Sequence, residues 1–394
     1  MTTCPPRLHS PQSVRRQLPA LLALALASCL AVTTEMLPIG LLPAIGDSLG
    51  AADSTTGLLV SLYALMVAVL AVPLTLATAR FPRKPLLLAT LAGYAVSNTV
   101  VALAPTVAMV ATGRVIGGLA HALFFSLCIG YVPRLIDRTQ VGRALSIATG
   151  GASAGFVLGV PLSTSLGTAV GWRASFGLLA ALAVATLLLV KRLLPGVDAE
   201  SPRHQDAPPG RRRDLAAVAA GNTLTYLGQF TLYTFISVLL RDAGAPPAAI
   251  GPILLMCGAC GLVGLWFAGR GVDRNPRRTA AVALGGVVIA LAVFGAGYPT
   301  LITIVMAAAV VNGAFGGVPL IYQACSVRTH AVSPELAGAW VNSTANAGIA
   351  GGAAIGAALL PTVGPAWLPW VAALLVGMSL ALSMVARQAF PSRP

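Results

Sequence analysis

The segment "LPALLALALASCLAVTTEMLPIGLL" at residues 18–42 is an apolar run that holds a single charged side chain, Glu35. Between Gln17 and Gly46 no other residue carries a formal charge. A helix of about 20 apolar residues spans the hydrocarbon core of a bilayer. A carboxylate at that depth is costly and is retained for a partner or a function. The segment therefore predicts a membrane-spanning helix that carries a functional acid.

The composition extends this prediction to the whole chain. Of 394 residues, 57% are hydrophobic and only 9% are charged, and the mean hydropathy is +0.84. Soluble domains carry about 25% charged residues. The predicted fold is an all-α integral membrane protein of about twelve transmembrane helices. The apolar windows lie at residues 18–42, 54–79, 85–103, 107–133, 142–168, 174–190, 215–240, 248–268, 279–297, 300–326, 336–360 and 366–386.

The net charge of +14 comes from Lys and Arg residues that lie mainly in the loops between predicted spans. Lys and Arg residues cluster before the first span and after every even-numbered span, whereas the odd-numbered exits hold only Arg173 and Arg241. Lys and Arg are retained on the cytoplasmic side of a membrane. We therefore expect both termini in the cytoplasm, a lipid bilayer as partner, and no nucleic-acid partner.

A segment rich in proline and arginine, residues 195–214, separates the sixth and seventh predicted spans. It predicts a cytoplasmic linker between two bundles of helices. The expected parts are a cytoplasmic N-terminus, an N-terminal six-helix bundle, the linker, a C-terminal six-helix bundle and a cytoplasmic tail. They cover residues 1–17, 18–194, 195–214, 215–387 and 388–394.

The two halves resemble each other in their loops and glycines. "TLATARFPRK" (75–84) aligns with "GRGVDRNPRR" (269–278). The fifth and eleventh spans each hold glycines four residues apart, which are Gly151, Gly155 and Gly159 in one and Gly348, Gly352 and Gly356 in the other. This spacing places the glycines on one helix face, where a neighbouring helix can approach closely. Ordinary helix packing is sufficient to explain such a strip.

Four further segments are distinctive: "TTEMLPIGLLP" (33–43), "ATARFPRKPLLL" (77–88), "GLAHALFFS" (118–126) and "FVLGVPLSTSLGTAVGWRASF" (156–176). Together they resemble the Major Facilitator Superfamily, and within it the twelve-helix drug:proton antiporters that include sugar-efflux and chloramphenicol-export permeases. The likeness covers nearly the whole chain. It implies a monomer in a bacterial inner membrane that moves a small-molecule substrate. It also implies a proton as coupling ion, without metal or other cofactor.

The resemblance assigns a conformational latch to motif residues. The matching positions are Gly150, Gly159 and Pro161 in the fifth span, Arg80, Arg83 and Lys84 in the loop at 75–84, and Gly269, Asp273, Arg274, Arg277 and Arg278 in the loop at 269–278. Ala79 replaces the usual aspartate, which in the family meets a helix N-terminus in the opposite half. Asp273 would form the other latch near Arg143, and Glu335 could supply the charge that Ala79 lacks. Solvated loop charges are the alternative for both acids.

Arg114 and His121 are the other strongly titratable residues well inside a predicted span. They are seven residues apart and so share one helix face. Arg114 must meet a cavity, a carbonyl or an acid, or else snorkel to the membrane surface. His121 could also be a neutral core residue. The resemblance places spans one, four, seven and ten around a cavity, where Glu35, Arg114 and His121 would couple a proton to transport.

The seventh span carries a stripe of amides and phenols at helical spacing, which are Asn222, Tyr226, Gln229 and Tyr233. The tenth and eleventh spans add the amides of Asn312, Gln323, Asn342 and Asn346. Amides donate and accept hydrogen bonds at once. These residues are the predicted substrate site, suited to a neutral or hydroxylated ligand, although Asn346 could instead join helices.

These features predict a proton-coupled exporter of small organic solutes, such as sugars or chloramphenicol-like drugs, that works by alternating access. Export rests on the resemblance. A proton-coupled importer or a uniporter remains open. A channel is disfavoured because no ring of charges is apparent. A membrane-embedded enzyme is disfavoured because no span holds a carboxylate pair, a metal-ligand cluster or an activated nucleophile.

Overall fold

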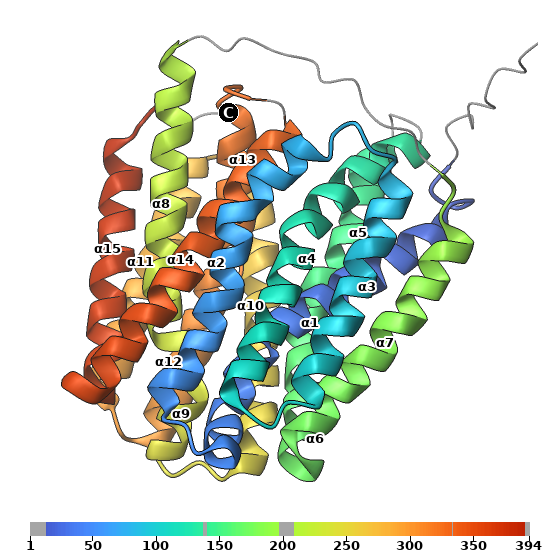
Figure 1. Cartoon of the computed structure of the whole chain (residues 1–394). Helices are drawn as coiled ribbons and strands as arrows, with labels where there is room; N and C mark the ends of the chain where they lie inside the picture. The colour runs from blue at the N-terminus through green and yellow to red at the C-terminus, as the bar shows by residue number, and fades with distance from the viewer. Residues whose placement is uncertain (1–12, 137–139, 197–208, 333, 391–394) are drawn as a thin grey trace, which may run out of the picture.

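The computed structural model describes residues 13–136, 140–196, 209–332 and 334–390. In this part of the chain, twelve helices are long and apolar enough to cross a membrane. They stand side by side (Figure 1). The predicted fold class is confirmed.

The N-terminal half holds α1 (Leu18–Leu49), α2 (Asp53–Ala77), α3 (Arg83–Ala102), α4 (Val107–Leu135), α5 (Val141–Ala154), a π-helical turn (Gly155–Gly159), α6 (Val160–Val170) and α7 (Trp172–Leu193). The C-terminal half holds α8 (Pro209–Tyr233), α9 (Ile236–Asp242), α10 (Pro247–Gly271), α11 (Pro276–Gly297), α12 (Leu301–Phe315), α13 (Val318–Arg328), α14 (Pro334–Thr362), a short 3-10 turn (Pro365–Trp367) and α15 (Leu368–Val385). The fifth, seventh and tenth spans are each composed of two helical pieces.

The two ends of the bundle differ in charge. We call the end formed by the connections at 50–52, 103–106, 243–246 and 298–300 the Asp47 end; it lies at the bottom of Figure 1. The opposite end, formed by the connections at 78–82, 194–196, 272–275 and 329–332, is the Lys84 end. The described chain also begins and ends there (Figure 1). The clustered cations therefore gather at one end, as the alternating pattern predicts.

Two helices extend beyond their predicted limits. The first span continues to Leu49, because Pro38 and Pro43 lie inside α1 without ending it. The seventh span begins at Pro209, inside the segment expected to be linker, because proline fits the first turn of a helix. Residues 197–208 of that linker, residues 1–12 and residues 391–394 lie outside the described chain.

The seventh span is interrupted where Phe235 packs between two glycines. A Cβ added at Gly57 of α2 or Gly356 of α14 would lie 2.4 or 2.5 Å from the Phe235 ring. The tenth span is interrupted at Gly316 and Gly317, where a Cβ at Gly316 would meet the Gly261 carbonyl of α10 at 2.0 Å. Close helix contact at glycine explains both positions, which hydropathy alone does not reveal.

Both predicted glycine strips pack against the first helix of their own half. A Cβ at Gly155 would lie 2.5 Å from the carbonyl oxygen of Cys29 on α1. A Cβ at Gly352 would lie 2.4 Å from the carbonyl oxygen of Leu227 on α8. The equivalent contacts support the internal repeat, and they show that the strips bring helix backbones together within each half.

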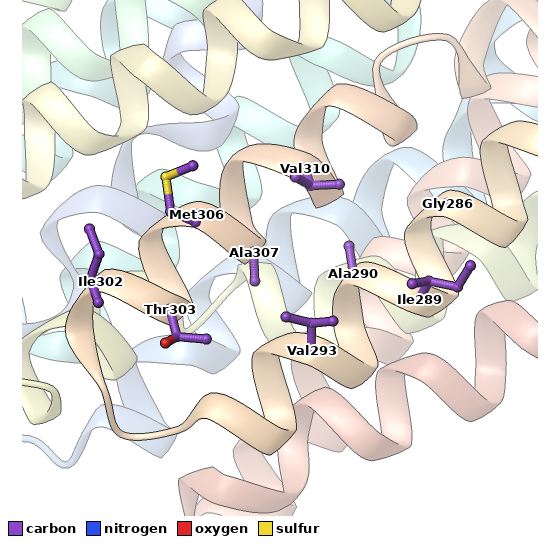
Figure 2. A pocket seen from close by; sticks show the side chains of 9 residues that line it. All are labelled: Gly286, Ile289, Ala290, Val293, Ile302, Thr303, Met306, Ala307 and Val310. Carbon is purple, nitrogen blue, oxygen red and sulfur yellow. The ribbon is translucent and has the colours of Figure 1, made fainter.

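An apolar groove of about 520 Å³ lies on the outside of the bundle between α11 and α12 (Figure 2). Ile289 and Ile302 on its rim are each 68% exposed. Exposed aliphatic side chains on a membrane-spanning helix face lipid. The groove contains none of the predicted site residues.

The glycine strips give a direct stability prediction. Gly155→Ala should lower the melting temperature of the purified protein, because the new methyl group would force α5–α6 away from α1 at a cost of about 1–3 kcal/mol. Gly150→Ala is the matched control, since a Cβ there meets no atom within 4 Å. Equal melting temperatures for the two variants would contradict the strip contact.

Candidate functional site

Arg114 of α4 is buried at 1% exposure and is bound by backbone carbonyls. Its Nη1 donates to the Thr34 carbonyl and its Nη2 to the Glu35 carbonyl, both at 2.7 Å, and its Nε donates to the Leu59 carbonyl at 3.3 Å. Pro38 has no N–H with which to bind the Thr34 carbonyl in the helix. Arg114 therefore satisfies an acceptor that the proline leaves open.

This geometry decides between the alternatives for Arg114. A snorkelling guanidinium would reach polar surroundings, whereas Arg114 lies inside the half, with its Cζ 4.1 Å above the centre of the Tyr63 ring. Its hydrogen bonds go to the main chain of α1 and α2. The cation is thus fixed beside Glu35 by the backbone.

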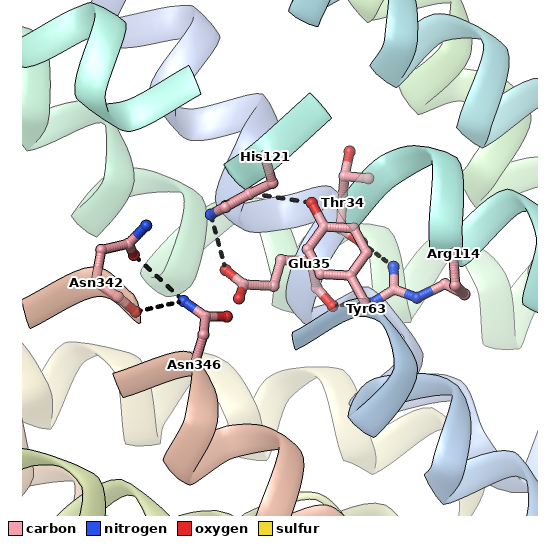
Figure 3. Close-up of polar contacts among 7 residues, drawn as sticks. All are labelled: Thr34, Glu35, Tyr63, Arg114, His121, Asn342 and Asn346. Atoms are coloured by element: carbon pink, nitrogen blue, oxygen red, sulfur yellow. Dashed lines mark hydrogen bonds and ion pairs between the residues drawn. The ribbon is translucent and has the colours of Figure 1, made fainter. Parts of the chain in front are cut away.

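Glu35 of α1 and His121 of α4 lie side by side. The Glu35 Oε2 atom lies 3.6 Å from His121 Nε2, and the other imidazole nitrogen, Nδ1, lies 3.0 Å from the Tyr63 hydroxyl (Figure 3). Both Glu35 and His121 are buried, at 6% and 1% exposure. The predicted trio of Glu35, Arg114 and His121 is therefore assembled in one place, with Tyr63 as a fourth member.

The second oxygen of the Glu35 carboxyl group differs from the first. Glu35 Oε1 is buried and has no hydrogen-bond partner among the described residues. A buried acceptor without a donor costs about 1–3 kcal/mol, and more when the group is charged. A donor that reached Glu35 Oε1, whether a bound proton or a ligand, would remove this cost.

Two amides of α14 bond each other. Asn346 Nδ2 donates to the Asn342 carbonyl at 3.0 Å and to Asn342 Oδ1 at 3.2 Å (Figure 3). Asn346 Oδ1 is buried without a hydrogen-bond partner in the described chain. Each half therefore holds an unpaired buried acceptor among its described residues.

The stripe on α8 divides into two groups. Asn222 joins α8 to α14, because its Nδ2 donates to the Val341 carbonyl at 2.8 Å and to Thr344 Oγ1 at 2.9 Å. Tyr226 and Tyr233 instead belong to a chain of aromatic rings. The rings that they contact are those of Phe230, of Phe315 on α12 and of Phe156 in the N-terminal half.

This aromatic chain crosses between the halves. Tyr233 stacks on Phe156 with ring centres 5.9 Å apart and an interplanar angle of 26°. Gln229, between the two tyrosines, is buried, and its Oε1 atom has no hydrogen-bond partner among the described residues. Asn312 donates to the Ala308 carbonyl of its own helix at 2.9 Å, and Gln323 is half-buried. The substrate roles of all eight residues stay predictions.

The two halves are joined at the Asp47 end. Ser237 Oγ of α9 donates to the Ile39 carbonyl of α1 at 2.6 Å in a buried contact. That carbonyl is the one that Pro43 leaves without an intrahelical N–H. Nearer the surface, Arg241 pairs with Asp47 at 3.0 Å. The first span of each half, α1 in one and α8 with α9 in the other, therefore contacts the other at this end.

The described latch residues make contacts within their own half. Asp273 pairs with Arg328 at 3.0 Å. The side chains of Arg143 and Glu335 lie outside what the structure describes. Lys84 donates to the Leu194 carbonyl and Arg277 to the Met384 carbonyl, whereas Arg80, Arg274 and Arg278 have exposed side chains. The latch itself stays a prediction.

The motif glycines also differ in their packing. A Cβ at Gly159 would meet Thr33 Oγ1 of α1 at 2.0 Å, whereas Gly150 and Gly269 have room for a side chain. Pro161 is buried directly after the π-helical turn. Of the three glycines Gly150, Gly159 and Gly269, only Gly159 lies so close to a neighbouring helix that a side chain would clash.

The sequence did not identify Tyr63, Thr34 and Phe156 as candidate site residues. Tyrosine, threonine and phenylalanine are ordinary in a membrane helix, so their presence in a span does not indicate a functional site. One clue was available for Thr34, since it lies four residues before Pro38 and its carbonyl must find a donor elsewhere.

Arg114→Ala should lower both the melting temperature and transport. The change leaves buried carbonyls without donors, and each unsatisfied group costs about 1–3 kcal/mol. Arg241→Ala is the control, because an exposed pair contributes less than about 1 kcal/mol. Melting temperatures of both purified variants, measured alongside flux at equal protein level, test this. Indistinguishable effects would show that the carbonyl contacts of Arg114 are dispensable.

Several known proteins are similar to this chain in sequence. The sequence profile of the Major Facilitator Superfamily matches residues 24–324. A chloramphenicol efflux pump of Mycobacterium tuberculosis is 33% identical over 272 residues, which are 68% of this chain and 66% of that protein. A chloramphenicol resistance protein of Streptomyces lividans is 30% identical over 94% of this chain and 95% of its own length.

Other relatives carry different names. A probable sugar efflux transporter of Mannheimia succiniciproducens is 28% identical over 91% of each chain. A crystal structure of a D-xylose–proton symporter superposes with a TM-score of 0.74 over 96% of this chain and 99% of its own, at 16% identity, which supports the fold alone. From its sequence profile and its relatives, the chain belongs to the Major Facilitator Superfamily, a family of membrane transporters and not of enzymes.

Proposed function

We propose that this transporter exports small organic solutes in exchange for protons and that Glu35 carries the coupled proton. The observation that carries the proposal is the buried Glu35 carboxyl group, with one oxygen at His121 and the other unpaired. Burial favours the protonated form of a carboxyl group, and a nearby cation favours the ionised form. A group held between these influences can load and release a proton as its surroundings change.

The contacts between the halves support alternating access. Bundles 18–194 and 215–387 would rock about a central site. The Ser237 and Arg241 contacts join the halves at the Asp47 end in this conformer. If the cation-rich Lys84 end is cytoplasmic, both termini are cytoplasmic and the Asp47 end faces outward. The protein would then act as a monomer in a bacterial inner membrane, with the proton as coupling ion and no other cofactor.

Two observations support the substrate class. Aromatic rings suit a flat or apolar part of a ligand, and unpaired amide oxygens at Gln229 and Asn346 suit a ligand with hydroxyl or N–H donors. The names of the relatives, chloramphenicol efflux and sugar efflux, fit neutral molecules with hydroxyl groups. Chloramphenicol and simple sugars are the first candidates. A proton-coupled importer with the same site is the second candidate function.

Topology can be tested by thiol labelling on a cysteine-free background. Ala52→Cys lies at the exposed Asp47 end and Arg212→Cys at the exposed start of α8. An impermeant maleimide added to intact cells should label Ala52→Cys but not Arg212→Cys, and permeabilised cells should show both. Labelling of Arg212→Cys in intact cells would reverse the proposed orientation.

Proton coupling can be tested with Glu35→Gln. The variant keeps the side-chain shape, imitates the protonated state and should abolish chloramphenicol or sugar uptake driven by a pH gradient into inverted vesicles. Asp47→Asn, an exposed carboxylate on the same helix, should retain the response to the gradient. A well-folded Glu35→Gln protein whose flux still follows the pH gradient would exclude Glu35 as the essential proton carrier.

A further inference from the structure

Tyr63 occupies a position that the proposed transport cycle does not yet use. It is fully buried on α2, its hydroxyl oxygen lies 3.0 Å from His121 Nδ1, and the Arg114 guanidinium lies over its ring face. Arg114 and His121 both belong to α4, so the tyrosine from α2 fills the space between them. His121 in turn contacts Glu35 through its other nitrogen.

The contacts of a neutral imidazole depend on which nitrogen carries its proton. In the first arrangement, the Tyr63 hydroxyl donates to Nδ1, and Nε2–H faces an ionised Glu35 across the 3.6 Å contact. In the second, a protonated Glu35 faces an unprotonated Nε2, and Nδ1–H donates to the Tyr63 oxygen. A hydroxyl can serve both arrangements because it donates and accepts.

We propose that Tyr63 is a positioning residue, whose hydroxyl sets the tautomer of His121 and thereby connects the charge state of Glu35 to Arg114. The proposal rests on Glu35 as the proton site. One proton enters when the first arrangement becomes the second. The proton on Nε2 passes to Glu35 and the incoming proton binds Nδ1, so His121 is neutral before and after.

Arg114 makes the two arrangements unequal. A cation above an aromatic ring draws electron density from it and strengthens the hydroxyl as a donor. This favours the first arrangement, in which Glu35 is ionised. Removal of the hydroxyl therefore costs the ionised state more than the protonated state, and Glu35 should then bind its proton at a higher pH.

The other groups around the site come from several helices. Among the described residues, the titratable or charged ones are Glu35 on α1, Arg114 and Cys128 on α4, Tyr94 on α3 and Tyr226 on α8, and the hydroxyl groups of Tyr94 and Tyr63 interact. Tyr94 and Phe125 meet the imidazole through their rings, with centroids at 6.2 and 5.1 Å. Tyr63 is the one whose hydroxyl is bound to the imidazole.

The experiment follows the carboxyl band of Glu35 by infrared difference spectroscopy as the pH changes, with the band assigned by its loss in Glu35→Gln. In Tyr63→Phe the midpoint should move to higher pH by roughly half to one unit. Tyr322→Phe is the matched control, because it removes an equally buried hydroxyl that bonds Thr225 and Ser379 in the other half. Its midpoint should stay at the wild-type value. An unchanged midpoint in Tyr63→Phe would overturn the proposal.

A second measurement does not depend on the Tyr63 variant. The chain has four histidines, so replacing His9 and His204 with Gln and His330 with Asn leaves His121 alone. Nitrogen-15 NMR of this protein should show a neutral imidazole whose proton moves from Nε2 to Nδ1 as Glu35 becomes protonated. A single tautomer throughout, or a charged imidazolium at the Glu35 midpoint, would refute the relay. Neither readout involves transport, so failure here is separable from failure of the Glu35→Gln flux test.

Discussion

A backbone carbonyl inside a membrane must find a hydrogen-bond donor in the protein, and two prolines in α1 each remove one. Pro38 leaves the carbonyl of Thr34, four residues earlier, without its helical donor, and Arg114 of α4 donates to that carbonyl instead. Pro43 likewise leaves the carbonyl of Ile39 without a donor, and Ser237 of α9 donates to it. The position of the buried cation, and one contact between the halves, therefore follow from the positions of prolines in a single helix.

Most of the fold could be predicted from the sequence because hydrocarbon imposes a length and a composition on each span. The long apolar runs and the alternating cations gave the number and direction of the helices. Helix interruptions could not be predicted in the same way. The break before Ile236 depends on Phe235 fitting between Gly57 and Gly356, which are contacts of residues far apart in the chain. Hydropathy also placed the end of α1 too early. It does not show that another helix can donate a hydrogen bond to the carbonyl that a proline leaves without its helical donor.

The candidate site was only partly visible in the sequence. Glu35, Arg114 and His121 stand out because a charged or titratable group in hydrocarbon needs a reason to persist. Tyr63 gives no such signal, and its meaning comes only from the atoms on either side of it. Asn222 is a different case, since its Nδ2 bonds a neighbouring helix, which the sequence did not indicate, and its substrate role stays a prediction. The residue type shows that a buried polar group needs a hydrogen bond, but only the tertiary structure shows which residue is its partner.

The two carbonyls freed by proline differ in a way that bears on the transport cycle. Arg114 belongs to the same half as Thr34, so this contact can persist while the halves rock, and the cation remains beside Glu35. Ser237 belongs to the opposite half from Ile39, so opening of the Asp47 end must break that bond. The Ile39 carbonyl then needs water as its donor, and opening of that end is what admits water to it. Both carbonyls lie within a few residues of Glu35 on one helix. In the proposed cycle, a shift of α1 on proton binding or release would therefore change the Ser237–Ile39 contact between the halves directly. The contacts of Arg114 with α1 would be kept during the same shift.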